Sequence, residues 1–382
     1  MDVVIVGGGI IGLSSAYYLA KQGIDVTVVE KGNIGSGNTE RSAGGIRKQF
    51  STPVNVELSK ISADVWNQFE EEFGVDIQYR KIGYLFLARE EETAIGFKED
   101  VAMQNELGVE SKIVEPEEMT DYCAGLKPSL FKLGTYCPTD GFADPHLALQ
   151  GYAQAAQEVG VEIQTKTAVT DVLREDGAVV GVETEDATLN ADFVVNTAGA
   201  WAGRIAEFAD VSLPVAPRRR QCSIINPETP VPESDPYAID LDTGAYFRPE
   251  REGAAVAGGH FESHDPDVDP NTYSKQVDLE WMATVIEHVS EYSTYFGLDS
   301  EIKRGWAGLY AVTPDHHPII EETIPGFINA VGFSGHGFQH APATGQIVTD
   351  LVVTGETDLV DISPLHSDRF KKGMLIEEKN VA

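Results

Sequence analysis

The sequence predicts an α/β fold in which a parallel sheet with flanking helices is joined to a mostly antiparallel part. Two observations carry this prediction. Residues 2–30 follow a strand–helix–strand pattern typical of parallel sheets, and residues 212–310 contain short alternating strands with hairpin-like turns. The chain has 382 residues, more than one hydrophobic core usually organises, so we expect two domains or one elaborated domain.

The opening unit is a βαβ motif with a glycine-rich turn. Apolar strands are predicted at 2–6 and 25–30, with helical periodicity over 13–21. Gly7, Gly9 and Gly12 give the spacing G-x-G-x-x-G, where a side chain would block both the tight turn and a pyrophosphate at the helix N-terminus. Glu30 ends the second strand, where a carboxylate can bind the ribose hydroxyls of a dinucleotide and would repel a 2′-phosphate. NAD and FAD both satisfy this pattern.

Local signals predict the elements up to residue 160. Residues 32–50 are glycine-rich and polar with two arginines, which indicates a ligand-wrapping loop. Thr52 and Pro53 can cap and begin a helix over about 53–73, because apolar residues recur at helical spacing before Gly74. Residues 75–88 predict two short strands, and a helix is expected from Asp144 and Pro145 to near residue 160.

The rest of the chain alternates strands with hairpins and helices. Between 161 and 195 we expect two strands, a turn at Asp176 and Gly177, and two more strands. A hairpin is predicted at 245–260 and a helix around 277–296. Residues 325–355 predict a strand, a glycine-rich turn and a helix that begins near Ala341 or Pro342.

Three strand-to-turn junctions, at residues 6, 196 and 332, are expected to bring backbone N–H groups to one place. A nicotinamide dinucleotide is held by two mononucleotide-binding halves of one sheet. Here a single G-x-G-x-x-G is joined instead by a distant strand end and by the N-terminus of a C-terminal helix. This arrangement favours FAD in an extended conformation, with its isoalloxazine ring against the last turn.

Composition narrows the class of protein. Asp and Glu number 61 against 28 Lys and Arg, a net charge of −33, which disfavours nucleic acid and anionic membranes as partners and suggests a salt-loaded cytoplasm where charge is screened. No apolar run has the length of a membrane span, and the motif at residue 2 leaves no room for a signal peptide, so we expect a cytoplasmic protein. The three cysteines are expected to be reduced structural thiols, and no residues have metal-site spacing.

Four segments resemble one family over nearly the whole chain: VVIVGGGIIG with VVEKG, GSGNTERSAGGIR, WAGLYAVTPDHHPII and GFSGHGFQHAPATG. They are similar to the D-amino acid oxidase and sarcosine oxidase (DAO) group of FAD-dependent amine oxidoreductases, above all to the β subunits of dye-linked L-proline dehydrogenase and multimeric sarcosine oxidase. The resemblance implies an FAD-binding Rossmann-like domain of the p-hydroxybenzoate hydroxylase and glutathione reductase type. We expect this domain at 1–75, 140–211 and 312–382, and an antiparallel substrate domain over the flavin at 76–139 and 212–311.

The resemblance also implies which residues hold FAD. Glu30 would bind the adenosine ribose and Val169 the adenine, and the last helix N-terminus would stabilise negative charge on the reduced flavin. The full set expected around FAD is Gly7, Gly9, Ile11, Gly12, Glu30, Lys31, Ser36, Arg41, Ser42, Ala43, Gly44, Ile46, Val169, Thr197, Ala198, Gly199, Trp201, Gly308, Gly335, His336, Gly337, Phe338 and Gln339.

Departures from the family pattern bear on the flavin and on the electron acceptor. Monomeric sarcosine oxidase attaches its flavin through a cysteine where this chain has Gly308, so we expect non-covalent FAD. Basic residues that bind the substrate carboxylate in relatives are replaced by Tyr310 and Gln339, and another is missing near Phe50. The lysine that assists oxygen reduction in sarcosine oxidases aligns with Val256, which favours a dehydrogenase over an oxidase.

The catalytic candidates are charged or aromatic residues near the expected flavin. Arg248 is the main candidate for binding a carboxylate, and Arg47 resembles an arginine beside the ring. Two tyrosines and two histidines resemble pocket residues that bind substrate or tune the pKa of its amine: Tyr246, Tyr310, His260 and His336.

We therefore expect an enzyme that oxidises the C–N bond of a small secondary or tertiary amino acid, such as sarcosine, dimethylglycine or proline, by hydride transfer to FAD. Electrons would pass to a protein or quinone-like acceptor or to partner subunits. One alternative is a glycine or D-amino acid oxidase that produces peroxide. Another is a non-catalytic flavin-binding assembly or scaffold subunit.

Overall fold

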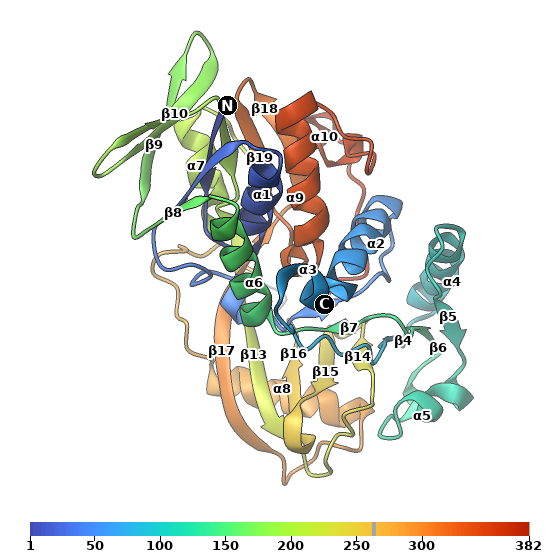
Figure 1. The fold of residues 1–382 in the computed structure, drawn as a ribbon. Helices are drawn as coiled ribbons and strands as arrows, with labels where there is room; N and C mark the ends of the chain where they lie inside the picture. Colours follow the sequence, from blue (N-terminus) through green and yellow to red (C-terminus); the bar gives the residue numbers. More distant parts are fainter. Residues whose placement is uncertain (262–264, 382) are drawn as a thin grey trace.

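Two large sheets organise the computed structural model, which describes residues 1–261 and 265–381 (Figure 1). The first sheet has six strands in the order β18-β19-β12-β1-β2-β8. Their bounds are Asp2–Val6 for β1, Asp25–Glu30 for β2, Glu162–Thr165 for β8, Phe193–Asn196 for β12, Ile319–Ile324 for β18 and Phe327–Val331 for β19. All neighbours pair in parallel except β18 and β19.

Helices cover one face of this sheet and a small sheet covers the other. The helical layer consists of α1 (Ile10–Lys21), α2 (Pro53–Asn67), α3 (Phe69–Phe73), α6 (Pro145–Glu158) and α9 (Gly337–Thr354), which share one apolar core with the sheet. The opposite face packs against α7 (Ala202–Phe208) and the antiparallel strands β9 (Val169–Glu175), β10 (Ala178–Thr184) and β11 (Thr188–Asn190).

The carboxyl ends of β1, β12 and β19 lie side by side, as the sequence predicts. The three strands are adjacent and parallel, with Val6 opposite Asn196 and Asn196 opposite Asn329. Parallel strands end at the same edge of a sheet, so the turns that follow them open into one space. This edge faces the second sheet.

The second sheet has eight strands in the order β17-β13-β16-β15-β14-β4-β6-β5. Their bounds are Glu301–Val312, Ala216–Asn226, Ala255–Gly258, Ala245–Pro249, Tyr237–Asp240, Tyr84–Ala88, Leu133–Cys137 and Lys112–Val114, in that order. Helix α8 (Leu279–Tyr292) covers one face, where it packs against Phe247. Tyr246, the neighbouring residue, points to the opposite face together with Tyr84 and Tyr237, because side chains alternate along a strand.

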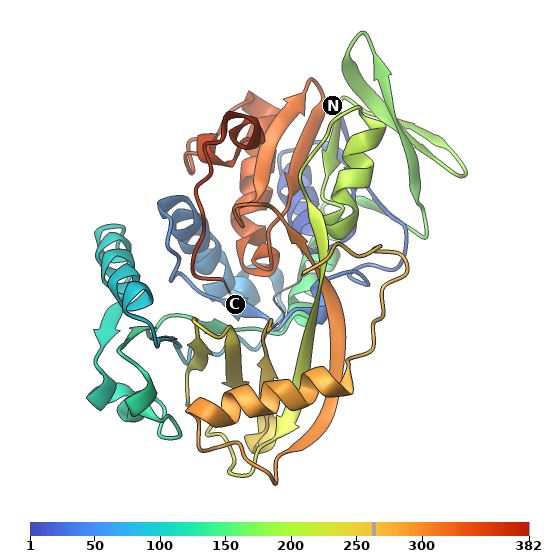
Figure 2. The same ribbon diagram turned by 180° about the vertical axis from the view of Figure 1, so that it is seen from behind.

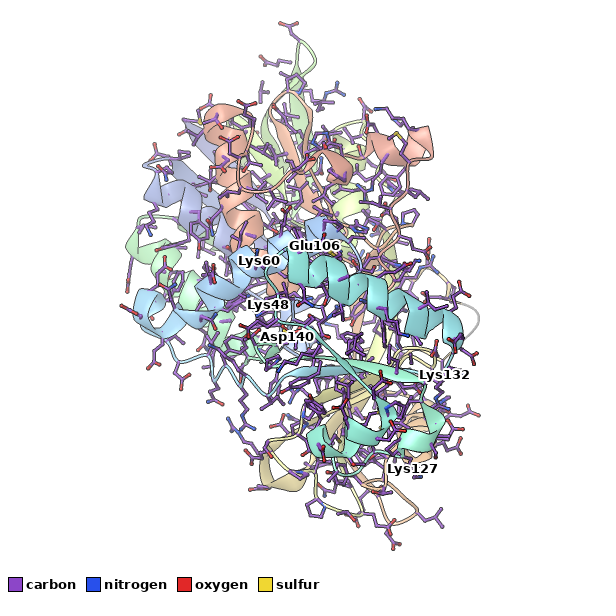
Figure 3. The ribbon with its side chains drawn as sticks, turned by 90° about the vertical axis from the view of Figure 1, so that its right-hand side faces the viewer. Lys48, Lys60, Glu106, Lys127, Lys132 and Asp140 are labelled. Atoms are coloured by element: carbon purple, nitrogen blue, oxygen red, sulfur yellow. The ribbon has the colours of Figure 1, made fainter. Side chains whose placement is uncertain are left out.

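A helical excursion stands at the far edge of the second sheet. It contains α4 (Glu91–Glu106) and α5 (Met119–Tyr122), and Figure 3 shows α4 on the near side of the molecule, running from Glu106 near Lys60 towards Lys132. Lys60 donates a hydrogen bond to the carbonyl of Leu107, which ties the end of α4 to α2. The remaining elements are β3 (Gly45–Ile46), which pairs with β7 (Gly141–Phe142), and α10 (Asp368–Lys372).

Two expectations about elements need correction here, and two further elements were not predicted. Residues 75–79 form no strand, and only Tyr84–Ala88 does in that segment. The helix expected over 53–73 is divided at Gln68 into α2 and α3. Helix α4 and the short strand β11 were not predicted, and in α4 only the narrow row Ala94, Phe97, Val101 and Gln104 is buried.

The last helix begins at Gly337, earlier than predicted, and Pro342 lies inside it. A proline removes one helical hydrogen bond and displaces the turn before it. Two side chains of α2 satisfy the displaced groups: Trp66 donates to the carbonyl of Gln339 at 2.9 Å, and Ser62 accepts from the N–H of Ala343 at 3.1 Å. None of the helices in the described chain is both long and apolar enough to cross a membrane.

Candidate cofactor and substrate site

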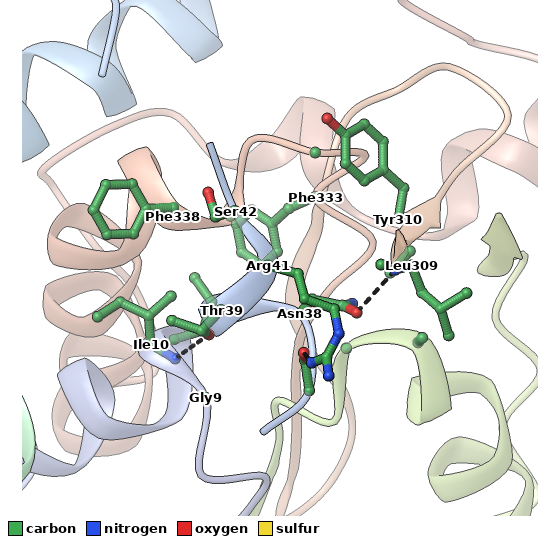
Figure 4. Close-up of a pocket in the computed structure, with 18 of the residues that line it drawn as sticks. Gly9, Ile10, Asn38, Thr39, Arg41, Ser42, Leu309, Tyr310, Phe333 and Phe338 are labelled. Atoms are coloured by element: carbon green, nitrogen blue, oxygen red, sulfur yellow. Dashed lines mark hydrogen bonds between the residues drawn. The ribbon is translucent and has the colours of Figure 1, made fainter. Parts of the chain in front are cut away.

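A cavity of about 640 Å³ lies between the edge of the first sheet and the face of the second. Its walls are the turns after β1, β12 and β19, the loop 35–47, strands β13 and β17, and the N-termini of α1 and α9. Figure 4 shows part of this wall, with Gly9 and Ile10 at the start of α1 and Phe338 at the start of α9. The cavity is therefore bordered by two helix N-termini, which attract negative charge.

The turn after β1 has no room for side chains. A Cβ at Gly12 would lie 2.0 Å from the carbonyl oxygen of Gly7, and a Cβ at Gly7 would lie 2.7 Å from the carbonyl oxygen of Thr197. Gly7 also has a φ of 114°, a conformation that favours glycine. These two glycines thus allow the tight turn and the close packing of α1 against β1 and the turn after β12, which a pyrophosphate cradle requires.

Glu30 closes this end of the cavity. Its carboxylate accepts hydrogen bonds from the N–H groups of Gly8 at 2.8 Å and Gly32 at 2.6 Å, which fix its position at the end of β2. The neighbouring Lys31 places its Nζ 3.3 Å from the centre of the Trp201 ring. Burial lowers the pKa of Lys31 to about 8.

The loop 35–47 is held against both sheets. Thr39 accepts a hydrogen bond from the N–H of Ile10 at 3.1 Å, and Asn38 accepts one from the N–H of Leu309 at 3.2 Å (Figure 4). Arg41 donates to the carbonyl of Ser36 at 2.7 Å. The loop therefore connects the start of α1 to β17 and covers the middle of the cavity.

At the other end, Arg47 is buried beside His336. The Arg47 guanidinium donates to the carbonyls of Gln49 and Asn380, and one of its nitrogens lies 3.2 Å from Nε2 of His336. Burial lowers the pKa of His336 well below its usual value, and the positive charge of Arg47 lowers it further. His336 is therefore neutral, its Nε2 accepts from Arg47, and Arg47 carries the positive charge.

Buried carboxylate contacts fix the segment after Arg47. Asp140 accepts a hydrogen bond from the N–H of Lys48 at 3.0 Å, and its carboxylate lies 3.7 Å from the Lys48 ammonium (Figure 3). Burial raises the pKa of Asp140. This pair joins the chain between the loop and α2 to the segment that follows β6 of the second sheet.

The second sheet contributes an aromatic wall. It consists of Tyr84, Phe86, Tyr237, Ile239, Tyr246 and Tyr310. Burial raises the pKa of each of these tyrosines, so their hydroxyls stay neutral. Cys222 also lines the wall, and burial raises the pKa of its thiol to about 11, which leaves it protonated.

The model of the FAD-dependent oxidoreductase family DAO matches residues 2–351 of the chain. The chain belongs to this family. Among its relatives, the FAD-dependent oxidoreductase domain-containing protein 1 of Bos taurus is 32% identical, over 99% of this chain and 86% of that protein. The sarcosine oxidase subunit beta of Rhodobacter capsulatus is 28% identical, over 100% of this chain and 91% of that protein.

The structural comparison agrees with the family. The crystal structure of L-proline dehydrogenase from P. horikoshii superposes with a TM-score of 0.89 and 34% identity, over 98% of this chain and 99% of that one. The family resemblance and the fold class predicted from the sequence are therefore confirmed. The chain has a DAO-family flavoprotein fold with mixed parallel and antiparallel sheets.

The DAO-family cofactor fits the cavity, because the glycine cradle, Glu30 and two helix N-termini border one continuous space. Nearly all residues predicted to bind FAD line that space, and three do not: Gly12, Gly44 and Ile46. These three support it from behind. Gly44, at a φ of 76°, would place a Cβ 2.0 Å from the carbonyl of Ala143, and Ile46 is buried in the core.

Some of the predicted catalytic residues line the cavity, and two do not. Arg47, Tyr246, Tyr310 and His336 line the cavity. Arg248 lies on the same strand as Tyr246 but outside the lining, where it pairs with Glu250 at 3.0 Å and stacks on Phe142 at 3.9 Å. His260 also lies outside the lining, with its Nε2 3.9 Å from Asp265.

Other lining residues were missed by sequence reasoning: Asn38, Thr39, Tyr84, Tyr237, Arg220 and Asn380. Tyr84 lies in a predicted strand, but the sequence does not show that its side chain faces the cavity. Asn380 reaches the cavity from the last residues of the chain, and no local pattern marks such a contact.

Proposed function

We propose that this DAO-family protein oxidises the C–N bond of a small secondary or tertiary amino acid, such as sarcosine, dimethylglycine or proline. The observation that supports this most directly is the end of the cavity at Arg47. There a buried guanidinium and four neutral tyrosines stand beside the N-terminus of α9. A cation for a carboxylate and an apolar wall for an amine are what such a substrate needs.

FAD, when bound, supplies the hydride acceptor. The chain's own residues then have the task of binding and orienting. Arg47 is the arginine that we assign to the substrate carboxylate, because it lines the cavity and is positioned by several acceptors. We keep Arg248 as the second candidate. The tyrosine hydroxyls and the aromatic wall exclude water and favour the neutral form of the amine.

The finer features of the proposal rest on this chain's departures from its relatives. Gly308 cannot form a covalent flavin link, and the side chain of Arg41 occupies the space beside it, with a Cβ at Gly308 only 3.1 Å from that of Arg41. We therefore propose non-covalent FAD. Val256, in place of a lysine, favours a dehydrogenase that passes electrons to another acceptor or to partner subunits in the cytoplasm.

The test is flavin reduction without oxygen. Sarcosine, dimethylglycine, L-proline, glycine and D-alanine are added separately to the FAD-loaded protein, and the visible flavin absorbance is followed. Bleaching by one of the first three is the expected result and names the substrate class. Bound FAD that none of these amines bleaches would contradict the proposal and favour a scaffold role.

A second candidate is an oxidase of a primary amino acid, such as glycine or a D-amino acid. It is favoured by the structural similarity to glycine oxidase from Geobacillus kaustophilus, which has a TM-score of 0.84 and 25% identity. The two candidates differ in product: an oxidase yields one peroxide per amine oxidised in air, whereas a dehydrogenase needs an artificial acceptor to turn over.

A further inference from the structure

Residues 265–278 cross one side of the molecule between the two sheets without forming a helix or strand. Figure 2 shows this segment in orange, running from the level of the first sheet down to α8. Pro270, Asn271, Tyr273 and Lys275 line the cavity, and Asn271 contacts Lys31 beside Glu30. We call residues 265–278 the strap. None of its residues belongs to the motifs that predict FAD binding.

Four aspartates of the strap are paired with four arginines. The pairs are Asp265 with Arg220 at 2.8 Å, Asp267 with Arg218 at 2.9 Å, Asp269 with Arg204 at 2.8 Å, and Asp278 with Arg219 at 2.6 Å. Three of the arginines are consecutive on β13, and Arg204 lies on α7 behind the first sheet. The pairs thus fasten the strap to both halves of the molecule.

Asn271 makes the contact at the cavity itself. Its Oδ1 accepts hydrogen bonds from the Lys31 ammonium at 3.1 Å and from Nε1 of Trp201 at 2.7 Å. Lys31 follows Glu30 directly, and Trp201 follows the turn after β12. One side chain of the strap therefore joins two elements that border the end of the cavity assigned to adenosine.

The other attachments of the strap are mainly polar: Arg219 donates to the carbonyls of Ser274 and Gln276, and the N–H of Asp278 donates to Gln221. Most of its residues are exposed, and Pro270 is the buried one among those described. Its backbone bonds to the rest of the chain include Val268 to the carbonyl of Pro217 and Ala307 to the carbonyl of Lys275, both at 3.0 Å. Because little apolar surface holds the strap, polar contacts are its main attachment: the ion pairs, Asn271 and the hydrogen bonds from β13.

We propose that the strap is a cofactor-binding element: it closes the adenosine end of the cavity, and its aspartate–arginine pairs and Asn271 set how fast FAD leaves. The proposal rests on the FAD binding proposed above. It assigns to Arg204 and to Arg218–Arg220 a role in retaining the cofactor, separate from any contact with substrate.

The test measures FAD dissociation directly. FAD-loaded protein is diluted at one fixed salt concentration, and the recovery of flavin fluorescence gives the dissociation rate. Removing one surface ion pair of ordinary strength should change the FAD dissociation rate by a factor of roughly three. We therefore expect the double variant Asp267→Asn/Asp269→Asn to release FAD about tenfold faster. Asn271→Ala, which leaves all four pairs in place, should also release FAD faster.

The control is Asp210→Asn, which removes an exposed pair with Arg174, 2.8 Å long, away from the cavity. It should release FAD at the wild-type rate. The apo forms of all variants should have the melting temperature of the wild-type apo protein. Wild-type release rates in both the double variant and Asn271→Ala would overturn the role of the strap. A wild-type protein that takes up no FAD would instead overturn the proposed function.

Discussion

At the scale of single residues, the site depends on which polar groups are charged in the buried space. Arg47 stays cationic between two carbonyls and a neutral histidine, whereas Arg248 is already paired with Glu250. An arginine whose charge is balanced by a carboxylate attracts a second carboxylate less strongly. The sequence identifies both arginines as candidates, but the pairing separates them.

We expect Arg47→Lys to raise KM for a carboxylated amine by about 10- to 100-fold, the loss of a charged hydrogen bond. Arg248→Lys, the matched variant, should leave KM within a few-fold of the wild-type value. Steady-state kinetics with the amine that bleaches the flavin provide the measurement. A larger rise of KM in Arg248→Lys than in Arg47→Lys would show that Arg248 binds the substrate carboxylate.

Buried histidines give the protein a predictable response to acid. Burial lowers the pKa of His340 to about 3, while an unfolded histidine titrates near 6.5. Between these values the unfolded chain binds more protons, so the free energy of unfolding falls as pH falls, by about 1.4 kcal/mol per pH unit for this residue.

The measurement is urea denaturation of the wild type and of His340→Gln between pH 7 and 5. Asp100 and Asp140, whose pKa values are raised by burial, titrate with the opposite sign, but their contribution cancels in the difference between the two proteins. We expect the variant to have the shallower acid loss. The exposed His146→Gln serves as the control, and parallel curves for His340→Gln and wild type would contradict the prediction.

At the scale of elements, the segment after α10 returns to the start of α2. Glu378 is 1% exposed, and its carboxylate accepts from Ser51, Thr52 and Asn55 at 2.7–3.0 Å. Two residues later the carbonyl of Asn380 accepts from Arg47. The acid thus stabilises the N-terminus of α2, as a negative charge does at a helix start, and fixes the segment that touches the site.

Replacing this carboxylate by an amide removes its charge and places an N–H group among partners that all donate to the wild-type carboxylate. We expect Glu378→Gln to lower the free energy of unfolding by about 1.5–3 kcal/mol. The neighbouring exposed Glu377→Gln should change it by less than about 0.5 kcal/mol. Chemical denaturation of both variants measures the difference, and equal stability of the two would show that Glu378 does not hold the segment.

At the scale of the whole molecule, the charge of −33 dominates. Mutual repulsion of surface carboxylates destabilises the compact state, and salt screens it, since the Debye length falls from about 10 Å at 0.1 M to about 3 Å at 1 M. The division of the chain into an FAD domain and a substrate domain at the predicted boundaries stays a prediction.

We therefore expect the melting temperature to rise steeply as KCl increases from low concentration towards 1 M, because screening is nearly complete there. Calorimetry of the FAD-loaded protein measures it. Sucrose at the same osmolarity, which carries no charge, should not reproduce the steep part of the rise. A melting temperature that does not change with KCl would contradict the proposed adaptation to salt.

The sequence by itself determined the local patterns: the first βαβ unit, the cap at Asp144, and the hairpin at Asp176 and Gly177. These depend on residues close together in the chain, whose backbone preferences can be read in a short window. It also identified the family and the meeting of three strand ends at one edge, and most of the residues that it predicts to bind FAD line the cavity.

Only the tertiary structure decided which side chains meet. The carbonyl of Asn380 accepts a hydrogen bond from Arg47, and Glu250 forms an ion pair with Arg248. The aspartates of the strap pair with arginines of β13 and α7. Most of these contacts join residues from different elements, and the pair with Glu250 decides that Arg248 is already balanced by a carboxylate. Strand register and helix packing therefore fix them. No periodicity in the sequence records that geometry, because a charged residue follows the same local pattern whether it faces substrate, an acid or water.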